Sequence, residues 1–337
     1  MPTLKKILFI HGRSFKPKKA DWQALWHDAI TFGLERDFGP SILKTFQAAD
    51  PEYVYYGDLN NAFLEKHKNS TRPDDIKDRR ESLEELKTYG AHQFRKAQYR
   101  RLPGVNPWYD HLADTFGAFA NAIHLGQPVI QGYAPDMAHY WSEAEFGGGV
   151  RWRLTEPLRQ ALADNREVMI VAHSLGSIIA YDALWKFSRY GEYRNHPDTA
   201  TQVNRPGGGK PKPISALVTL GSPLSDETVK RNLKGAKNKD AWKYPDNLKY
   251  WYNVAAEDDF ICHDTNLRND FEGMIKLGLI ERKRFVQPLS KVYNLAVRSG
   301  ENGQRASNPH NGVGYLLHPV TVEYIGKWLR GSPVTMG

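Results

Sequence analysis

Residues 166–181 constrain the fold most in this chain of 337 residues, because they read as a strand, a sharp turn and a helix. The apolar run Val-Met-Ile-Val at 168–171 is typical of a strand that is buried on both faces. The residues Ala-His-Ser-Leu-Gly at 172–176 interrupt this run, and apolar residues return at helical spacing over 177–187. A buried strand that leads directly into a helix predicts an α/β domain.

Ser174 lies at the corner between the strand and the helix. A serine between small residues at such a corner matches the pattern called the nucleophile elbow. Ala172 stands where this pattern usually has glycine, and Gly176 completes it. Small residues are needed on both sides because the turn is strained and a bulky group would collide across it. The alternative is a serine in an ordinary strand-to-helix turn, and the rest of the chain must decide between the two.

Predicted strands and helices alternate along the chain, which favours a mainly parallel central sheet flanked by crossover helices. One helix, over 150–163, is expected to direct Trp152, Leu154, Leu158 and Leu162 inward. Strands are predicted at 5–12, 52–58, 168–171, 214–221, 248–255 and 291–297. Helices are predicted at 20–34, 107–125, 150–163, 177–187, 270–279 and 319–329.

Residues 60–101 differ in composition from the rest of the chain, because charged residues dominate and apolar residues are sparse. We interpret 60–125 as a helical insertion or lid within a single α/β domain that spans 1–337. The basic side chains of this segment either face an anionic substrate or are simply solvated. They are Arg79, Arg80, Arg95, Lys96, Arg100 and Arg101.

The composition indicates a soluble protein. The net charge of +8 is best interpreted as a solvated basic surface, because no nucleic-acid-binding module is recognisable. Cys262 is the one cysteine, so no internal disulfide can form, which favours a reducing compartment. The first apolar run, 7–10, is too short for a signal peptide, and no segment resembles a membrane span. We therefore expect a cytoplasmic protein with no transmembrane segment, and nothing supports contact with a membrane surface.

An attacking serine needs a base that takes its proton, and the base needs an orienting partner. In an elbow-type enzyme the chain order is serine, acid, histidine. Asp259 follows the predicted strand 248–255, and His310 lies in the loop after 291–297. Because parallel strands end at the same edge of a sheet, both side chains can reach Ser174.

Two other acids lie beside Asp259. Asp258 is the main rival, and Glu257 is the next. Asp259 is preferred because Phe260 and Ile261 follow it, and this apolar contact can hold the carboxylate still.

Two other histidines compete with His310 for the role of base. His318 precedes Pro319 at a helix start, where a histidine often serves as a cap, whereas His310 lies in a polar loop that can extend across a site. His173 adjoins Ser174 in sequence and should point away from it, so we interpret His173 as structural.

The oxyanion formed during attack on a carbonyl needs hydrogen-bond donors. The backbone N–H of Leu175, at the start of the helix, is one expected donor. The second should be the N–H of Arg13, in the loop after the His-Gly pair 11–12, with Ser14 as the alternative. The side chain of Arg13 either holds an anionic group of the substrate or points to water.

These motifs together resemble the α/β-hydrolase superfamily, and more narrowly its serine esterases and lipases, which include the GPI inositol-deacylase-like proteins. The resemblance covers most of the chain and rests on His-Gly at 11–12, Val-Ala-His-Ser-Leu-Gly-Ser at 171–177, Leu-Val-Thr-Leu-Gly-Ser-Pro-Leu at 217–224, Asp259 and His310. It implies hydrolysis of a small-molecule or lipid-like acyl compound through an acyl-enzyme, without metal or organic cofactor. The charged segment 60–101 matches no family pattern that we can name.

The leading hypothesis is a carboxylic-ester hydrolase in which Ser174 attacks, His310 transfers the proton and Asp259 orients His310. The same residues would also suit amide hydrolysis or acyl transfer. A different class is a non-catalytic binding protein that keeps the hydrolase fold. A metal enzyme is less favoured, because the nearest ligand pair is the loop dipeptide His-Asp at 263–264.

Overall fold

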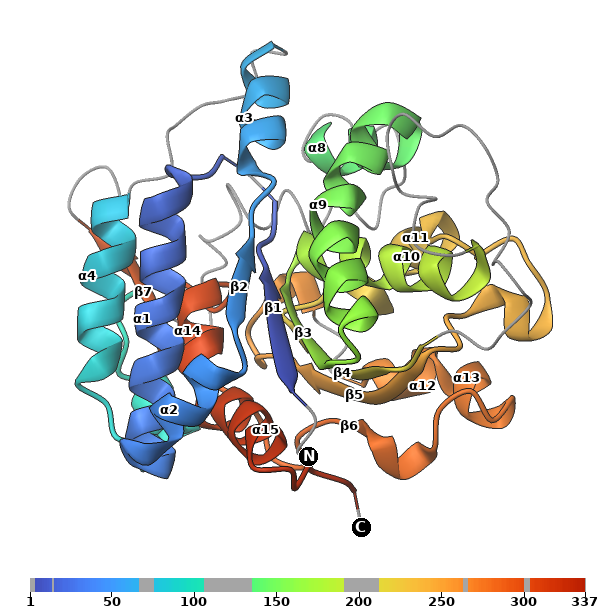
Figure 1. Ribbon diagram of the computed structural model, residues 1–337. Helices are drawn as coiled ribbons and strands as arrows, with labels where there is room; N and C mark the ends of the chain where they lie inside the picture. Colours follow the sequence, from blue (N-terminus) through green and yellow to red (C-terminus); the bar gives the residue numbers. More distant parts are fainter. Residues whose placement is uncertain are drawn as a thin grey trace.

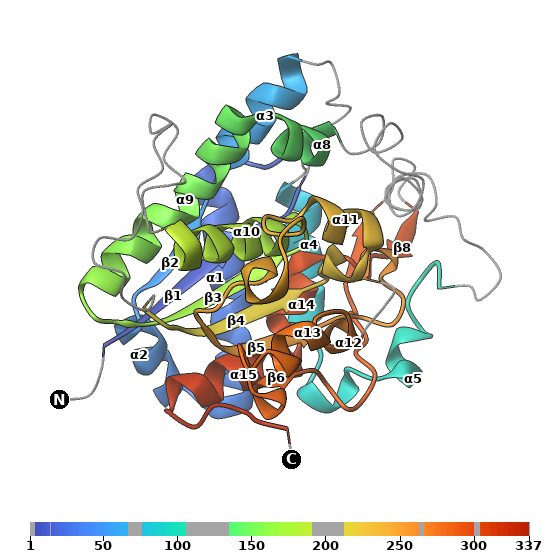
Figure 2. The same cartoon turned by 90° about the vertical axis from the view of Figure 1, so that its right-hand side faces the viewer.

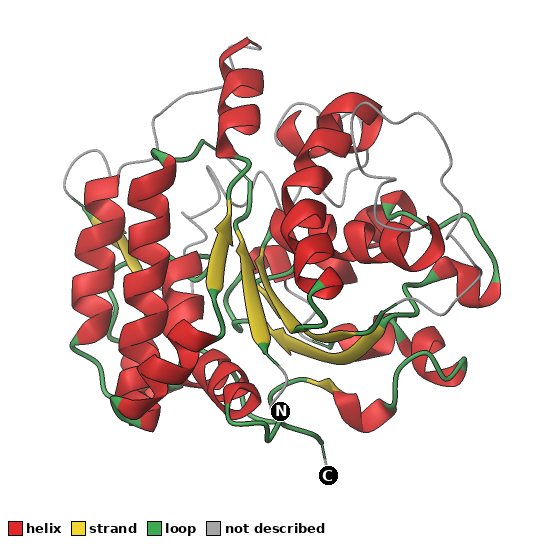
Figure 3. Cartoon of the chain, viewed as in Figure 1, coloured by secondary structure: helices red, strands yellow, loops and turns green. Residues whose placement is uncertain are grey.

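The computed structural model describes residues 4–13, 15–66, 76–105, 135–190, 212–262, 266–299 and 304–336. Over these ranges the chain forms a six-stranded parallel sheet with helices on both faces (Figure 1). Figure 3 shows the same layers, with the yellow strands running between groups of red helices. The predicted α/β class is therefore confirmed. The predicted helix at 107–125 lies outside the described residues.

The central sheet has the order β2-β1-β3-β4-β5-β6, and every neighbouring pair is parallel. The direction in which strands are added reverses between β1 and β3, and open parallel sheets place their sites at the carboxyl ends of the strands beside such a point. The strands are β1 Lys5–Ile10, β2 Pro51–Val54, β3 Glu167–His173, β4 Ile214–Leu220, β5 Leu248–Val254 and β6 Phe285–Val286. A separate antiparallel pair is formed by β7 Val297–Ser299 and β8 Arg305–Ser307.

Two hydrophobic cores lie on opposite faces of the sheet, because side chains alternate along each strand. Phe9 and Val171 face one core, with Trp22 and Trp26, whereas Ile10 and Ala172 face the other. The first core is covered by α1 Lys19–Phe38, α2 Ser41–Ala48, α14 Gly312–Leu317 and α15 Pro319–Leu329. The second is covered by α8 Pro135–Ser142, α9 Ala144–Ala163 and α10 Leu175–Tyr190 (Figure 2).

The remaining helices lie at the ends of the strands or on the outside. In the charged segment, helix α4, Ile76–Lys87, packs against α1 on the side away from the sheet (Figure 1). Arg80 of α4 pairs with Asp21 of α1 at 2.9 Å. The interpretation of 60–125 as an insertion or lid stays a prediction, since 67–75 and 106–134 lie outside the described residues. The helices outside the two main layers are α3 Gly57–Lys66, α4 Ile76–Lys87, α5 Lys96–Tyr99, α11 Glu227–Asn232, α12 Leu267–Asp270 and α13 Glu272–Lys276.

The predicted strand at 291–297 is wrong. The sixth strand of the sheet is β6, and residues 291–296 form only the bridge between Val292 and Ala256 before β7 begins. The physical reason lies in the buried side chain of Asn294. It donates to the backbone carbonyls of Pro309 and Asn311 and accepts from the backbone N–H of Ala296, so this N–H is not used in strand pairing.

The boundaries of two other elements also differ from prediction. Helix α9 begins before the glycine run at 147–149, because Gly147 lets the backbone of α8 pack closely at Tyr140. Arg151 is buried in this helix, whereas Trp152, predicted to face inward, is only partly buried. The strand predicted over 52–58 is shorter in the structure, because β2 ends at Val54 and α3 begins at Gly57. Among the described residues, none of the helices has both the length and the apolar character of a membrane span.

Candidate active site

Ser174 forms the corner between β3 and α10, and its backbone is in the left-handed region with φ of +55°. Residues other than glycine seldom adopt this conformation, so the corner is strained. The end of β1 packs against it. A Cβ atom added to Gly12 would lie 2.6 Å from the Cβ of Ser174, and one added to Gly176 would lie 2.5 Å from the carbonyl oxygen of His11. Both glycines are therefore required by close backbone approach.

The structure brings Ser174, His310 and Asp259 into one hydrogen-bonded chain. Nε2 of His310 lies 2.8 Å from Oγ of Ser174, and Nδ1 of His310 lies 2.8 Å from Oδ2 of Asp259. A carboxylate only accepts hydrogen bonds, so Nδ1 carries the imidazole proton and Nε2 is left to accept from the serine hydroxyl. Ser174 and Asp259 are buried, and the side chain of His310 is 11% exposed.

The carboxylate of Asp259 is held from several directions. Oδ1 accepts a hydrogen bond from the backbone N–H of Ile261 at 3.0 Å, and Oδ2 accepts one from the hydroxyl of Tyr315 at 2.7 Å. Gly221, with φ of +53°, lies beneath it, and a Cβ added there would be 2.9 Å from Oδ2. The rival Asp258 is exposed and takes no part in this arrangement.

Three successive carbonyl groups around His310 each accept a side-chain hydrogen bond. Nδ2 of Asn294 donates to the carbonyls of Pro309 and Asn311, both at 2.9 Å. Nε2 of His173 donates to the carbonyl of His310 at 3.0 Å. Burial, together with the neighbouring His310, lowers the pKa of His173 well below its ordinary value, so the ring is neutral. His173 thus contacts the loop of His310 rather than Ser174.

His318, the other candidate base, caps α15. It is buried, and its Nδ1 accepts a hydrogen bond from the backbone N–H of Val320 at 3.2 Å. Burial lowers the pKa of His318 to about 3, and Arg36 nearby acts in the same direction. This geometry corresponds to the capping alternative considered from the sequence.

The peptide between Gly12 and Arg13 is held on its carbonyl side. The carbonyl of Gly12 accepts from the hydroxyl of Tyr56 at 2.7 Å and from Nδ1 of His11 at 2.8 Å. Nε2 of His11 accepts from the backbone N–H of Tyr56, which fixes the tautomer, and burial lowers the pKa of His11. Because carbonyl and N–H point in opposite directions across a trans peptide, the N–H of Arg13 points away from Tyr56.

The side chain of Arg13 is directed at a protein carboxylate. Its Nε lies 3.2 Å from Oδ1 of Asp136, which is fully buried in the first turn of α8. The ammonium group of Lys16 donates to the carbonyl of Arg13. Leu175 is the first residue of α10, so its N–H has no acceptor within the helix. Ser14, the alternative donor, lies outside the described residues.

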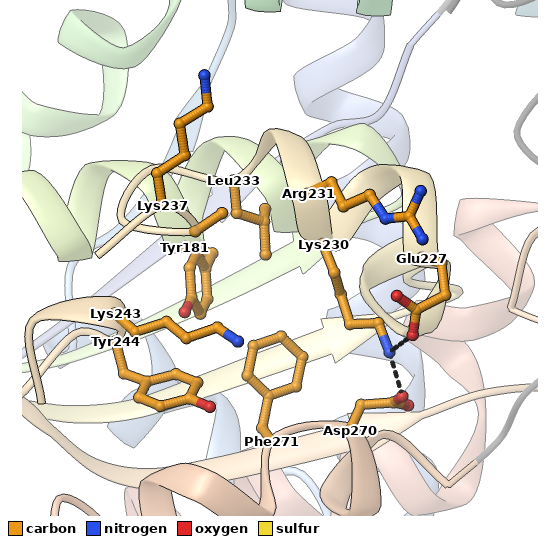
Figure 4. A pocket seen from close by; sticks show the side chains of 11 residues that line it. Tyr181, Glu227, Lys230, Arg231, Leu233, Lys237, Lys243, Tyr244, Asp270 and Phe271 are labelled. Atoms are coloured by element: carbon orange, nitrogen blue, oxygen red, sulfur yellow. Dashed lines mark hydrogen bonds and ion pairs between the residues drawn. The ribbon is translucent and has the colours of Figure 1, made fainter. Parts of the chain in front are cut away.

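A hollow of about 410 Å³ lies beside α11 and includes none of the three residues Ser174, Asp259 and His310 (Figure 4). Its apolar wall includes Tyr181 of α10 and Phe271, and Lys230 at its edge pairs with both Glu227 and Asp270 at 2.6 Å (Figure 4). The charge of Lys230 is therefore neutralised by neighbouring carboxylates, and Arg231, Lys237 and Lys243 also line the hollow.

The sequence matches no protein-family model, no curated protein sequence and no solved structure. Within the described ranges, no group of three or more His, Cys, Asp or Glu side chains could hold a metal ion. The dipeptide at 263–264 lies outside those ranges.

Four residues around the site were not singled out from the sequence. The side-chain contact that places each of them at the site is with a segment distant in the chain, so no local sequence motif identifies it. What the four residues share is a buried polar side chain, and burial is seen only in the structure. They are Tyr56, Asp136, Asn294 and Tyr315.

Proposed function

We propose that this protein is a serine hydrolase of the α/β-hydrolase type that cleaves carboxylic esters. One observation carries the proposal: an unbroken chain of hydrogen bonds runs from Ser174 through His310 to Asp259, with each link at 2.8 Å. Nucleophile, base and orienting acid are the three roles that acyl transfer from a serine requires.

The reaction proceeds in two halves. Oγ of Ser174 attacks the ester carbonyl while His310 takes the proton, and Asp259 stabilises the resulting imidazolium. The backbone N–H groups of Arg13 and Leu175 donate to the oxyanion of the tetrahedral intermediate. The intermediate collapses to an acyl-enzyme, and His310 returns the proton to the departing alcohol. Water, deprotonated by His310, then releases the carboxylic acid and regenerates Ser174.

The strained backbone of Ser174 favours an enzyme over a binding protein on the same fold. Holding a serine at φ of +55° costs on the order of 1–3 kcal/mol, and such strain is common at active sites. A protein that only binds a partner gains nothing from holding a serine hydroxyl in a hydrogen bond to a histidine at this strained corner. Amide hydrolysis and acyl transfer use the same groups, and they are outcomes of the substrate comparison below.

The experiment compares Ser174→Ala with the wild type on p-nitrophenyl acetate and with a fluorophosphonate probe. Removing the nucleophile should lower turnover by roughly 10⁴–10⁶-fold and abolish labelling. The matched control is Ser188→Ala, because Ser188 is also buried on α10 but its hydroxyl donates to the carbonyl of Trp185 in the same helix. Unchanged turnover in Ser174→Ala would overturn the proposal. A series of esters with longer acyl chains, with the matching anilides, then identifies the substrate class.

A further inference from the structure

We propose that Tyr315 is a positioning residue that controls how strongly Asp259 binds the imidazole of His310. Its consequence for catalysis rests on the proposed function, whereas its effect on His310 is measurable without any substrate. The hydroxyl of Tyr315 and Nδ1 of His310 meet at the same carboxylate oxygen, Oδ2 of Asp259, at 2.7 and 2.8 Å.

The direction of the Tyr315 hydrogen bond follows from its other partners. The backbone N–H of Ala256 donates to the phenol oxygen at 2.9 Å, which leaves the phenol proton for an acceptor. The two acceptors in reach are Oδ2 of Asp259 and Sγ of Cys262, at 3.5 Å, and a carboxylate is a much stronger acceptor than a thiol sulfur. Tyr315 is fully buried, and burial raises the pKa of its phenol well above the ordinary value, so it stays a donor.

Tyr315 and His310 belong to one structural unit. Asn311 follows His310 and caps α14, accepting from the N–H groups of Val313 and Gly314 at 2.8 and 3.2 Å. Tyr315 lies on that capped helix. The base and the second donor to the acid are therefore fixed relative to each other by a single capped turn.

The shared oxygen determines the chemical effect. A carboxylate oxygen that already accepts from a phenol is less basic, so it attracts the Nδ1 proton of His310 less strongly. The imidazolium that forms when His310 takes a proton is then less stabilised than it would be with Asp259 alone. Tyr315 thereby sets the strength of the hydrogen bond between Nδ1 of His310 and Oδ2 of Asp259. It also restricts rotation of the carboxylate, which keeps Oδ2 directed at the ring.

The other titratable groups packed around this pair do not reproduce the effect. His173, whose ring centroid lies 4.8 Å from that of His310, is neutral because burial lowers its pKa. Burial raises the pKa of Cys262, so it stays a neutral thiol. Tyr99 lies near Asp259, and burial raises its pKa to about 12, so it also stays neutral.

The test measures the pKa of His310 by NMR titration of its imidazole in the full-length protein, with His310→Gln to assign the signal. Tyr315→Phe should raise this pKa by roughly 0.5–1 unit, since the carboxylate loses a donor. Tyr324→Phe is the matched control, because Tyr324 is also a buried tyrosine, but it lies on α15 and stacks on Tyr252. A His310 pKa in Tyr315→Phe equal to that of wild type would overturn the proposal.

A role in folding alone is separated by the pH dependence of kcat/KM. Loss of the phenol should move the acidic limb of the profile to higher pH and lower the maximum about tenfold. A purely structural role would lower the thermal midpoint and leave the limb in place. If Ser174→Ala retained turnover, the proposed function would fail. The NMR titration would still test separately whether Tyr315 controls the bond between Asp259 and His310.

A second variant covers the case in which Tyr315→Phe does not fold. Replacing Tyr315 with 3-fluorotyrosine keeps the hydroxyl and makes it a stronger donor, because fluorine acidifies the phenol. The pKa of His310 should then fall below the wild-type value, opposite to the effect of phenylalanine. An unchanged pKa with this analogue would equally contradict the assignment.

Discussion

At the scale of single residues, the site depends on the absence of side chains as much as on their presence. Gly12, Gly176 and Gly221 each lie where a Cβ atom would enter the site or the backbone beneath it. Close packing of this kind leaves no room for adjustment, because protein interiors are as dense as crystals of small organic molecules. The glycines thereby bring three strand ends within reach of one another.

Gly12→Ala should impair activity far more than stability. The new Cβ would lie 2.6 Å from the Cβ of Ser174 and displace it, and a shift of about 1 Å in a reacting group can cost roughly 100-fold in rate. Gly149→Ala is the control, because its Cβ would only touch Leu59 at 3.7 Å, and the change should stabilise α9 by up to about 1 kcal/mol. Ester turnover and thermal unfolding check both; equal turnover in the two variants would contradict this account.

The acid can be tested by a pair of neighbouring substitutions. Asp259→Asn should lower kcat by roughly 10⁴-fold, because an amide can donate to Nδ1 and favour the wrong tautomer of His310. Asp258→Asn should stay within about threefold of wild type, since the side chain of Asp258 is exposed. Steady-state kinetics on one ester measure both. The assignment of Asp259 fails if the two variants lose activity equally.

At the scale of elements, helix α14 separates two histidines with different surroundings. His310 precedes the cap of α14, whereas His318 is itself the cap of α15. The first side chain is partly exposed at the site and the second is buried. The N–H groups at a helix start have no partner inside the helix and need a capping residue. Asn311 has that role in α14, whereas in α15 the capping residue is His318 itself.

His318→Asn should make stability less sensitive to acid. The pKa of His318 is lowered from 6.5 to about 3 in the folded protein, so between these values the unfolded chain binds a proton that the folded chain does not. The free energy of unfolding therefore falls as pH falls below 6.5, by up to about 1.4 kcal/mol per pH unit for this group. Asparagine keeps a capping acceptor without this proton.

Urea unfolding at several pH values between 4.5 and 6.5 measures this slope for wild type and His318→Asn. His92→Asn is the control, because His92 is exposed. We expect the free energy of unfolding of His318→Asn to depend less on pH, by up to about 1.4 kcal/mol per pH unit. The control should keep the wild-type slope. Parallel curves for wild type and His318→Asn would contradict a buried neutral His318.

At the scale of the whole molecule, the parts readable from the sequence were those with a local signal. The apolar runs of β3, β4 and β5 and the amphipathic patterns of α1 and α15 predicted these elements near their observed positions. The placement of Ser174 and Asp259 at one edge followed from the rule that parallel strands end together. His310 reaches the same edge on the turn before α14, and not at the end of the strand that was predicted over 291–297. Their catalytic roles stay predictions until measured.

The remaining features depended on contacts between distant segments. Strand β6 has only two residues, too few for a periodic pattern, and Asn294 diverts the segment that resembled a strand. The glycine run at 147–149 has low helix propensity, yet packing of α8 against Gly147 places it inside α9. The contact of Tyr315 with Asp259 joins helix α14 to the loop after β5, and neither local sequence indicates it.

The order of the site along the chain has a consequence for biosynthesis. Ser174 is made 136 residues before His310, which is on the order of 10 s at typical translation rates. During that interval the strand, the corner and its helix can already fold on the emerging chain, but the serine has no base beside it. The capped helix α14 then delivers His310 and Tyr315 to Asp259 together. On the proposed function, we therefore expect a nascent chain to be inert toward acyl compounds, with reactivity toward fluorophosphonates beginning only when the last helices dock on the sheet.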